Sequence, residues 1–405
     1  MAKRANQSRV LIYSHDSFGL GHLRRCRTIA HDLVRRHQDM SVLILSGSPI
    51  IGSFDFRSRV DFIRVPGVIK LRNGEYTSLN LHIDTEETLA MRTSIIEHTA
   101  EIFDPDLFIV DKEPLGLRGE VKGTLEMMRE RGTPTALGLR DVMDEPAALA
   151  PEWERKKVLP ALRDLYDRIW IYGLPQICDP LEGIDLPPSV LRKVVYTGYL
   201  YREPLAVRHG PGAPFDRPYI LVTPGGGGDG EMMVDWVLRA YEEASSDIHF
   251  PSLVVLGPFM SSEAQHAFIE RADRLDDVEV ITFDSRMERL VQDCVGMVAM
   301  GGYNTFCEIL SFDKRALLIP RTIPRMEQHI RASRAASLGL VTMLSPDEEA
   351  TTARMVEALA RLPYQHKPSE VVLPGLLEGL DNVDRLVSHA IDESTVMPYR
   401  TRTRA

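Results

Sequence analysis

The stretch Val298-Ala-Met-Gly301-Gly302-Tyr-Asn304-Thr305-Phe-Cys-Glu308-Ile-Leu310 joins an apolar run to two glycines and then to an amphipathic pattern. The apolar run predicts a buried strand, and the residues after the glycines predict a helix. Glycine lets a backbone approach a ligand closely, and the free N–H groups at a helix start favour an anion. Asn304 and Thr305 offer a helix cap and phosphate-facing groups. Glu308, one turn further on the same side, offers a carboxylate that can accept hydrogen bonds from ribose hydroxyls.

The segment that follows repeats this arrangement. Ala316–Pro320 predicts the next strand, which ends at Arg321, and Glu327 and Gln328 open the helix after it. The carboxyl ends of neighbouring parallel strands meet at one edge of a sheet, where open α/β sheets bind their ligands. The sequence therefore predicts that the polar groups of both segments converge on one place.

Short apolar runs alternate with longer amphipathic ones along the rest of the chain. Continuous β-branched runs separated by helices predict an α/β fold with parallel sheets covered on both faces. We predict strands at Val10–Tyr13, Ser41–Leu45, Val60–Val65, Leu107–Val110, Pro134–Leu139, Arg168–Tyr172, Val194–Thr197, Tyr219–Thr223, Ser252–Leu256, Val278–Phe283, Gly296–Met300 and Val341–Leu344. The clearest predicted helices are His22–Arg36, Thr85–Phe103, Gly119–Arg131 and Leu376–Asp392.

A change in amino-acid composition divides the chain. Residues 201–217 are rich in proline and glycine, which predicts a hinge linker between two doubly wound domains. We therefore expect an N-terminal domain over residues 1–200 and a C-terminal domain over residues 218–392, whose last helix can cross back to the first domain. The basic stretch 393–405 is expected to be a tail.

Two further glycine-rich turns follow predicted strands. The first contains Gly19 and Gly21 and leads into His22 and Arg24, so a histidine and a cation stand at a helix start. The second is the run Gly225, Gly226, Gly227, Gly228. The second run lacks the Lys-Ser/Thr of a P-loop, and no acidic residue ends the strand after it, as a dinucleotide site usually requires. Each loop alone is also typical of a plain strand-to-helix turn.

Composition narrows the class of protein. The chain has 405 residues, with Lys+Arg 48 against Asp+Glu 58, and its net charge of -10 disfavours a nucleic-acid binder. Four scattered cysteines disfavour a zinc ribbon or a disulfide framework and fit a reducing cytosol. We find no signal peptide and no membrane span, so we expect a cytoplasmic enzyme with at most peripheral membrane contact.

Taken together, the motifs resemble those of GT-B glycosyltransferases, and most closely glycosyltransferase family 28. The resemblance runs in order through the Gly-x-Gly-His loop, the hinge, the second glycine loop, Gly-Gly-x-Asn-Thr-x-x-Glu and Pro-Arg…Glu-Gln. It implies two Rossmann-like domains with an interdomain cleft. The first loop is also similar to that of the nucleotide-sugar hydrolase of pseudaminic acid synthesis, which shares the architecture.

The resemblance also assigns roles to residues. It implies that His22 is the general base toward the acceptor and that Glu308 binds the ribose of a UDP-sugar. The backbone of Phe283 would contact the base, Glu327 and Gln328 the sugar hydroxyls, and the glycine turns the diphosphate. The implied donor site comprises Gly225, Gly226, Gly227, Gly228, Phe283, Gly301, Gly302, Asn304, Thr305, Glu308, Arg321, Glu327 and Gln328. The acceptor or phosphate side comprises Gly19, Gly21, Arg24, Asp111 and Arg140.

The expected activity is the transfer of a hexose, such as an N-acetylhexosamine, from a UDP-sugar to a hydroxyl of a small-molecule, glycan or lipid-linked acceptor. Backbone N–H groups and Arg321 or Arg325 would meet the leaving-group charge, so neither a metal nor another cofactor is expected. A nucleotide-sugar hydrolase, a UDP-sugar 2-epimerase and a non-catalytic nucleotide-sugar sensor remain open, because all would share the donor site. Asp111 and Arg140 are equally interpretable as members of surface ion pairs with Lys112 and Asp141.

Overall fold

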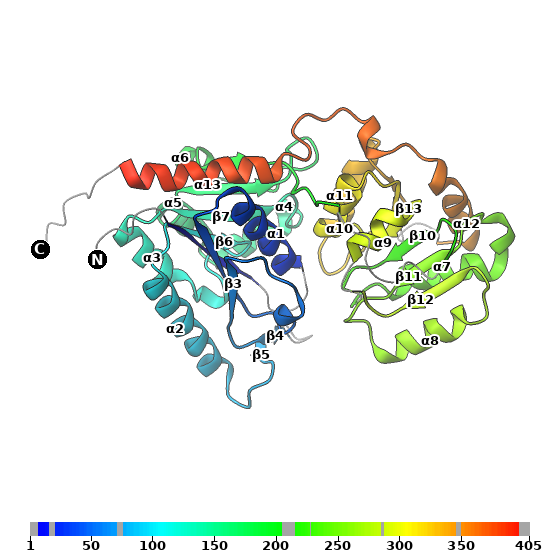
Figure 1. Cartoon of the computed structure of the whole chain (residues 1–405), viewed down its shortest axis with the longest axis horizontal. Coiled ribbons are helices and arrows are strands. Elements are labelled where there is room, and N and C mark those ends of the chain that lie inside the picture. The colour runs from blue at the N-terminus through cyan, green and yellow to red at the C-terminus, as the bar shows by residue number, and fades with distance from the viewer. Residues whose placement is uncertain are drawn as a thin grey trace, which may run out of the picture.

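A computed structural model describes residues 7–15, 21–70, 76–204, 215–226, 228–284, 287–345 and 350–396. These residues form two α/β bodies that lie side by side (Figure 1). We call them the first unit, which contains the N-terminal sheet, and the second unit, which contains the C-terminal sheet. The domain boundaries given above stay predictions, since residues 205–214 of the predicted hinge and 397–405 of the predicted tail lie outside the described ranges.

The first unit is built on a seven-stranded sheet of order β3-β2-β1-β6-β7-β8-β9, in which all neighbouring strands are parallel. Its strands are β1 (Ser8–Ser14), β2 (Met40–Ser46), β3 (Val60–Arg64), β6 (Leu107–Asp111), β7 (Thr135–Arg140), β8 (Arg168–Tyr172) and β9 (Val194–Tyr196). A separate antiparallel hairpin pairs β4 (Val68–Lys70) with β5 (Tyr76–Ser78). The helices between these strands are α1 (Gly21–Arg36), α2 (Thr85–Phe103), α3 (Lys122–Arg131), α4 (Pro146–Arg155), α5 (Val158–Asp164) and α6 (Pro188–Leu191).

The second unit contains a six-stranded parallel sheet of order β12-β11-β10-β13-β14-β15. Its strands are β10 (Ile220–Thr223), β11 (Ser252–Val255), β12 (Val278–Ile281), β13 (Gly296–Ala299), β14 (Ala316–Leu318) and β15 (Thr342–Met343). Its helices are α7 (Glu231–Ala244), α8 (Ser262–Ala272), α9 (Met287–Asp293), α10 (Tyr303–Ser311), α11 (Glu327–Ser337) and α12 (Thr352–Arg361). Short 3-10 helices are η1 (Ile51–Ser53), η2 (Leu117–Gly119), η3 (Ser245–Asp247), η4 (Leu362–Tyr364) and η5 (Pro368–Glu370).

The predicted strands and helices agree with the observed ones to within a few residues. The central strands are apolar and buried on both faces, as β1, β6 and β10 show. One difference has a clear cause: α3 begins at Lys122 rather than at Gly119. Arg118 and Gly119 have φ of 48° and 94°, a conformation that a right-handed helix cannot contain.

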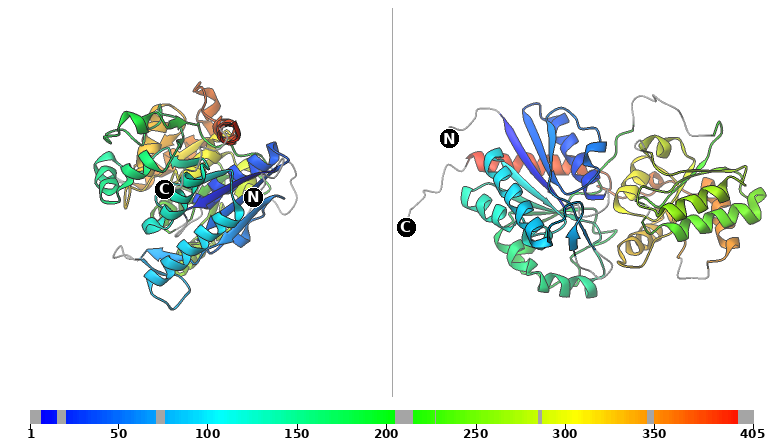
Figure 2. Two further views of the ribbon diagram at one scale, coloured as in Figure 1. Left: turned by 90° about the vertical axis from the view of Figure 1, so that its left-hand side faces the viewer. Right: turned by 90° about the horizontal axis from the view of Figure 1, so that it is seen from below.

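The last helix, α13 (Gly379–Val396), returns to the first unit. It packs along α1 and β6 (Figure 2). Arg36 Nη2 lies 2.5 Å from an Asp381 carboxylate oxygen, and His37 Nε2 lies 2.6 Å from an Asp384 carboxylate oxygen. The chain therefore passes between the two units twice.

The two passages touch each other. Tyr199 N–H donates to the Leu376 carbonyl at 2.8 Å, and Gly379 N–H donates to the Tyr199 carbonyl at 3.1 Å. Gly198 has φ of 86°, and a Cβ there would lie 2.3 Å from the Gly375 carbonyl oxygen. Glycine is thus required by both conformation and close approach, and the two passages form one narrow neck.

Candidate active site

The strand order of each sheet places its ligand-binding edge. In both sheets the order reverses beside the first strand, between β1 and β6 in the first unit and between β10 and β13 in the second. Open α/β sheets bind ligands outside the carboxyl ends of the strands at this reversal. The start of α1 at Gly21 and the end of β6 at Asp111 lie at the first reversal. The second glycine turn and Gly301 lie at the second.

The two edges face each other. Asn304 at the start of α10 donates from Nδ2 to the Gly21 carbonyl at 2.9 Å, which joins the second unit to the start of α1. Helices α1 and α10 lie against each other across the junction of the units. Gly19 and Gly227, two residues of the predicted site, lie outside the described residues.

His22 is held by a carboxylate at the end of the neighbouring strand. Its Nδ1 lies 2.6 Å from Asp111 Oδ2, and the Arg25 guanidinium binds Asp111 through two hydrogen bonds of 2.8 and 2.7 Å. Burial by itself raises the pKa of the Asp111 carboxyl. The opposing effect of Arg25 and His22 is larger, so the pKa falls to about 2. Because Asp111 is ionised, we assign the imidazole proton to Nδ1, which leaves the lone pair on Nε2.

Burial also decides the charge of His22. It lowers the pKa of the imidazole to about 4, against the opposing effect of Asp111, so the ring is neutral near pH 7. A neutral imidazole with an oriented Nδ1–H is the form that accepts a proton from a hydroxyl. The geometry therefore fits the base role predicted for His22.

The arginines in the first turn of α1 are neutralised by carboxylates. Arg25 is 1% exposed, and its guanidinium binds both carboxylate oxygens of Asp111. The guanidinium also lies 5.3 Å from the centre of the Tyr303 ring. Arg24 forms an ion pair across the junction with Glu308. Its Nη2 also lies 3.1 Å from Glu288 Oε1. Each of these two arginines therefore completes a buried or half-buried ion pair.

Glu308, the predicted ribose ligand, is 2% exposed and pairs with Arg24 from the first unit. Burial raises the pKa of the Glu308 carboxyl, whereas Arg24 lowers it. Glu288 was missed by the sequence reasoning, since its place beside Glu308 depends on how α9 packs against α10. A carboxylate at this place can accept hydroxyl hydrogen bonds, as predicted, but it is shared with a cation of the opposite unit.

The expected helix cap at Asn304 is wrong. Gly302 is the N-cap residue of α10, and no side chain caps that helix. The Asn304 side chain instead bridges the units, since its Oδ1 accepts from Arg202 at 2.7 Å while its Nδ2 donates to Gly21. Thr305 lies half-buried one residue later. The N–H groups at the start of α10, with Gly301 at φ of 79°, form the anion-favouring feature here.

The second glycine turn approaches the backbone after β11. Gly225 has φ of 83° and open space around it, so conformation rather than room requires glycine there. Gly226 and Gly228 lie against Phe259, whose N–H donates to the Gly226 carbonyl at 2.9 Å. Phe283 follows β12 and is 43% exposed, and its predicted contact with the base stays a prediction.

Arg321 connects the second glycine turn to the predicted sugar-facing pair. Its guanidinium forms ion pairs with Asp229 and, at 3.4 Å, with Glu327, and its backbone N–H donates to Gln328 Oε1 at 3.2 Å. Arg140, at the end of β7, also pairs with Glu327 from the first unit. Burial by itself raises the pKa of Glu327. The opposing effect of Arg140, Arg331 and Arg321 is larger, so the pKa falls to about 2. The structure thus brings Arg140, Arg321, Glu327 and Gln328 together.

The alternative of a surface pair at the end of β7 is wrong. Asp141 is fully buried and binds Arg331 of α11, and Asp111 at the end of β6 is 1% exposed. Arg331 was missed, although its place four residues after Glu327 puts it on the same side of a helix. Arg325 also turns away from the donor side, toward Glu152 at 3.0 Å and Asp144 at 3.5 Å in the first unit.

Two features are absent from the part of the chain that the structure describes. Within it, no group of three or more His, Cys, Asp and Glu side chains is arranged to hold a metal ion. Of the helices that the structure describes, none has both the length and the apolar character of a membrane-spanning segment.

Comparisons with known proteins address the fold and the family. Residues 231–369 match the model of the glycosyltransferase family 28 C-terminal domain. The MurG structure from Acinetobacter baumannii is 12% identical, covers 96% of this chain and 100% of its own, and has a TM-score of 0.54. The UGT2 structure from Phytolacca americana, complexed with UDP-2fluoro-glucose and pterostilbene, is 14% identical, with coverages of 95% and 99% and a TM-score of 0.61.

The glycosyltransferase VinC, in complex with dTDP, is 17% identical, with coverages of 96% and 96% and a TM-score of 0.55. At these identities the structures establish a shared fold, and the family match supplies the class of activity. A search of curated proteins finds no match. The chain is a nucleotide-sugar-dependent glycosyltransferase of the GT-B fold, with a glycosyltransferase family 28 C-terminal domain over residues 231–369.

Proposed function

We propose that the protein transfers a hexose, such as an N-acetylhexosamine, from a UDP-sugar to an acceptor hydroxyl, with His22 as the general base. The observation that carries the proposal is the contact of 2.6 Å between His22 Nδ1 and Asp111 Oδ2. The ionised carboxylate orients the ring, and the neutral ring can take a proton at pH 7. The acceptor can be a small molecule, a glycan or a lipid-linked hydroxyl.

The transfer step uses groups from both units. The acceptor hydroxyl gives its proton to His22 Nε2 as its oxygen bonds to the anomeric carbon. The bond between that carbon and the diphosphate breaks, and UDP leaves with the electron pair. In this proposal the N–H groups at the start of α10 and the Arg321 guanidinium stabilise the charge that develops on the diphosphate. Glu308 accepts from the ribose, and Glu327 and Gln328 accept from the sugar.

This charge stabilisation supports transfer without a metal ion. We expect the rate of transfer to be the same in EDTA as in Mg²⁺, because N–H groups and arginine supply the positive field that a metal would provide. A loss of activity in EDTA that Mg²⁺ or Mn²⁺ restores would refute this part of the proposal.

The decisive assay measures UDP release from a panel of UDP-sugars, with and without acceptors, and identifies the product by mass spectrometry. Release that requires an acceptor and yields a glycoside supports the proposal. Equal release without any acceptor identifies a hydrolase, and conversion to an epimer identifies an epimerase. Saturable UDP binding without turnover on the whole panel identifies a sensor.

Two histidines of α1 give a matched pair of variants for the base. His22→Ala is expected to lower kcat by about 10²–10⁴-fold, which is the usual contribution of a positioned general base, while the Kd of UDP stays within about threefold. His31→Ala alters the same helix at a side chain that packs edge-on against Phe56 instead, and it should leave kcat unchanged. If His22→Ala abolishes UDP binding, the assignment of the base is wrong.

A further inference from the structure

The proposed reaction leaves one fully buried ion pair at the junction without a role. Arg331 of α11, in the second unit, and Asp141, just after β7 in the first, both have side chains that are 0% exposed. Asp141 Oδ1 accepts from Arg331 Nη2 at 2.6 Å, and Oδ2 accepts from Arg331 Nε at 2.7 Å. This bidentate arrangement is the strongest geometry available to an arginine and a carboxylate.

The remaining polar atoms of the pair also have partners. The hydroxyl of Tyr199, at the neck, donates to Asp141 Oδ2 at 2.7 Å, and Arg331 Nη1 donates to the Gly301 carbonyl at 2.8 Å. We call Arg331, Asp141, Tyr199 and the Gly301 carbonyl the junction cluster. A buried network with all of its members satisfied fixes one geometry, since any shift leaves a buried charge without its partner.

The position of the Gly301 carbonyl matters because Gly301 is the first residue of the turn before α10. Its φ of 79° sets the direction of the chain into Gly302, the N-cap of α10, whose following N–H groups are proposed to face the diphosphate. Arg331 holds this turn from behind, through its carbonyl. The guanidinium also lies 5.9 Å from the centre of the Tyr303 ring, in the first turn of the same helix.

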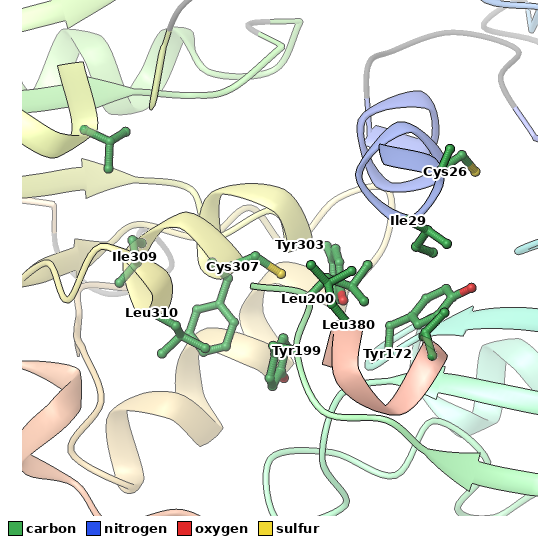
Figure 3. Close-up of a cluster of buried hydrophobic side chains, with 14 of the residues drawn as sticks. Cys26, Ile29, Tyr172, Tyr199, Leu200, Tyr303, Cys307, Ile309, Leu310 and Leu380 are labelled. Carbon is green, nitrogen blue, oxygen red and sulfur yellow. The ribbon is translucent and has the colours of Figure 1, made fainter. Parts of the chain in front are cut away.

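Aromatic packing ties the same helix to the neck. The rings of Tyr199 and Tyr303 are stacked with centres 5.9 Å apart, and Phe306 meets Tyr199 edge-on at 5.1 Å. Figure 3 shows Tyr199 and Tyr303 beside Leu200 and Leu380, at the place where the chain passes between the units. The turn before α10 is thus connected to the first unit by both charge and packing.

We propose that Asp141 and Arg331 are positioning residues that hold the diphosphate turn in its binding geometry, so that affinity for UDP depends on a first-unit carboxylate that touches no part of the ligand. Asp141 anchors Arg331, and Arg331 orients the Gly301 peptide. The inference rests on the proposed function, because it takes the turn before α10 as the diphosphate site.

A second cluster of the same composition provides the control. Arg92 binds Glu120 through two hydrogen bonds of 2.6 Å each, the Tyr13 hydroxyl donates to Glu120 at 2.5 Å, and Arg92 Nη1 donates to the Pro66 carbonyl at 2.6 Å. We call this the internal cluster, since all of its members lie in the first unit. It has the burial and bonding of the junction cluster, but its hydrogen bonds described above all stay within the first unit.

The test measures the Kd and the stoichiometry of UDP binding by isothermal titration calorimetry on the full chain. Asp141→Asn is expected to weaken UDP binding at least tenfold, whereas Glu120→Gln is expected to leave the Kd within twofold. Unfolding of part of the sample lowers the stoichiometry, but it does not change the Kd of the folded fraction. The two readouts therefore separate a positioning role from a structural one.

Arg331→Lys serves if Asp141→Asn fails to fold. Lysine keeps a positive charge beside Asp141, but a single ammonium group cannot reproduce the planar fork that reaches both the carboxylate and Gly301. We expect its Kd for UDP to rise at least fivefold at normal stoichiometry. A wild-type Kd in both Asp141→Asn and Arg331→Lys would overturn the inference. A wild-type protein that binds neither UDP nor UDP-sugars would instead overturn the proposed function.

Discussion

The junction cluster and the internal cluster contain the same parts in different places. Each consists of an arginine bound twice by a carboxylate, a tyrosine hydroxyl on that carboxylate and a backbone carbonyl on the arginine. The internal cluster joins α2 to β1 and the segment before α3, within one unit. The junction cluster joins two units. Identical chemistry therefore serves internal packing in one place and the relative position of two sheets in the other.

The largest effect is expected when a carboxylate is removed from either cluster. Asp141→Ala and Glu120→Ala each leave a buried guanidinium without its counter-charge, so each should lower the free energy of unfolding by about 3–5 kcal/mol. Urea denaturation followed by circular dichroism measures this loss. Similar losses would confirm that the clusters are energetically alike, and a loss of under 1 kcal/mol in Asp141→Ala would break the comparison.

The next largest effect is a loss of stability at low pH. It involves Glu327, a carboxylate of the second unit that faces the junction. Glu327 has a pKa of about 2 in the folded protein against 4.5 as its ordinary value. Its contribution to stability is therefore complete above pH 4.5 and is lost as the pH falls toward 2. At about 1.36 kcal/mol per pKa unit, it amounts to about 3 kcal/mol.

We expect Glu327→Gln to be less stable than wild type at pH 7 and to lose less stability between pH 4.5 and 2. Denaturation at several pH values measures both slopes. Glu86→Gln, at an exposed carboxylate of α2, should retain the wild-type slope. Parallel curves for Glu327→Gln and wild type would show that Glu327 does not depend on the cations of the junction.

A third prediction distinguishes the roles of two carboxylates that pair with Arg24. Glu308 is proposed to bind the ribose, whereas Glu288 only contributes to the position of Arg24. Glu308→Ala should weaken UDP binding by about 1–3 kcal/mol, which is about 5–150-fold, because a charge-assisted hydrogen bond to the ribose is lost. Glu288→Ala removes the other partner of Arg24 and should change the Kd less than threefold. Equal losses in both variants would mean that Arg24, rather than the ribose, explains the effect of Glu308.

The smallest effect is expected at an ion pair that water can reach. Arg325 of the second unit lies 3.0 Å from Glu152 of the first, and its side chain is 30% exposed. Arg325→Ala should lower the free energy of unfolding by at most about 1 kcal/mol, since solvent screens such pairs. A loss as large as that of Asp141→Ala would show that burial is not what distinguishes the junction cluster.

The sequence predicts the elements of this fold better than the contacts between its units. Apolar runs such as Val10–Tyr13 place the strands because burial on both faces requires continuous hydrophobic residues. The glycines at 301 and 302 predict a turn into a helix because few other residues allow it. Patterns of this kind are local, so they can be recognised from neighbouring positions.

The candidate site was predictable only where its residues lie close in sequence. Glu308 lies in the helix that directly follows Gly301, but its partner Arg24 is 284 positions away, and Asp141 lies 190 positions from Arg331. Such pairs form only when two separately folded sheets meet, and no local pattern records that meeting. The cap expected at Asn304 failed for the same reason, since its amide is engaged by residues of distant segments.

The double passage of the chain through the neck has a mechanical consequence. The second unit is inserted between the start and the end of the first. The two segments that connect the units lie side by side, with hydrogen bonds between them at Tyr199 and Gly379. A tensile load that pulls the units apart is therefore shared by two backbones in parallel. Cutting one of them leaves the other as a tether between the units.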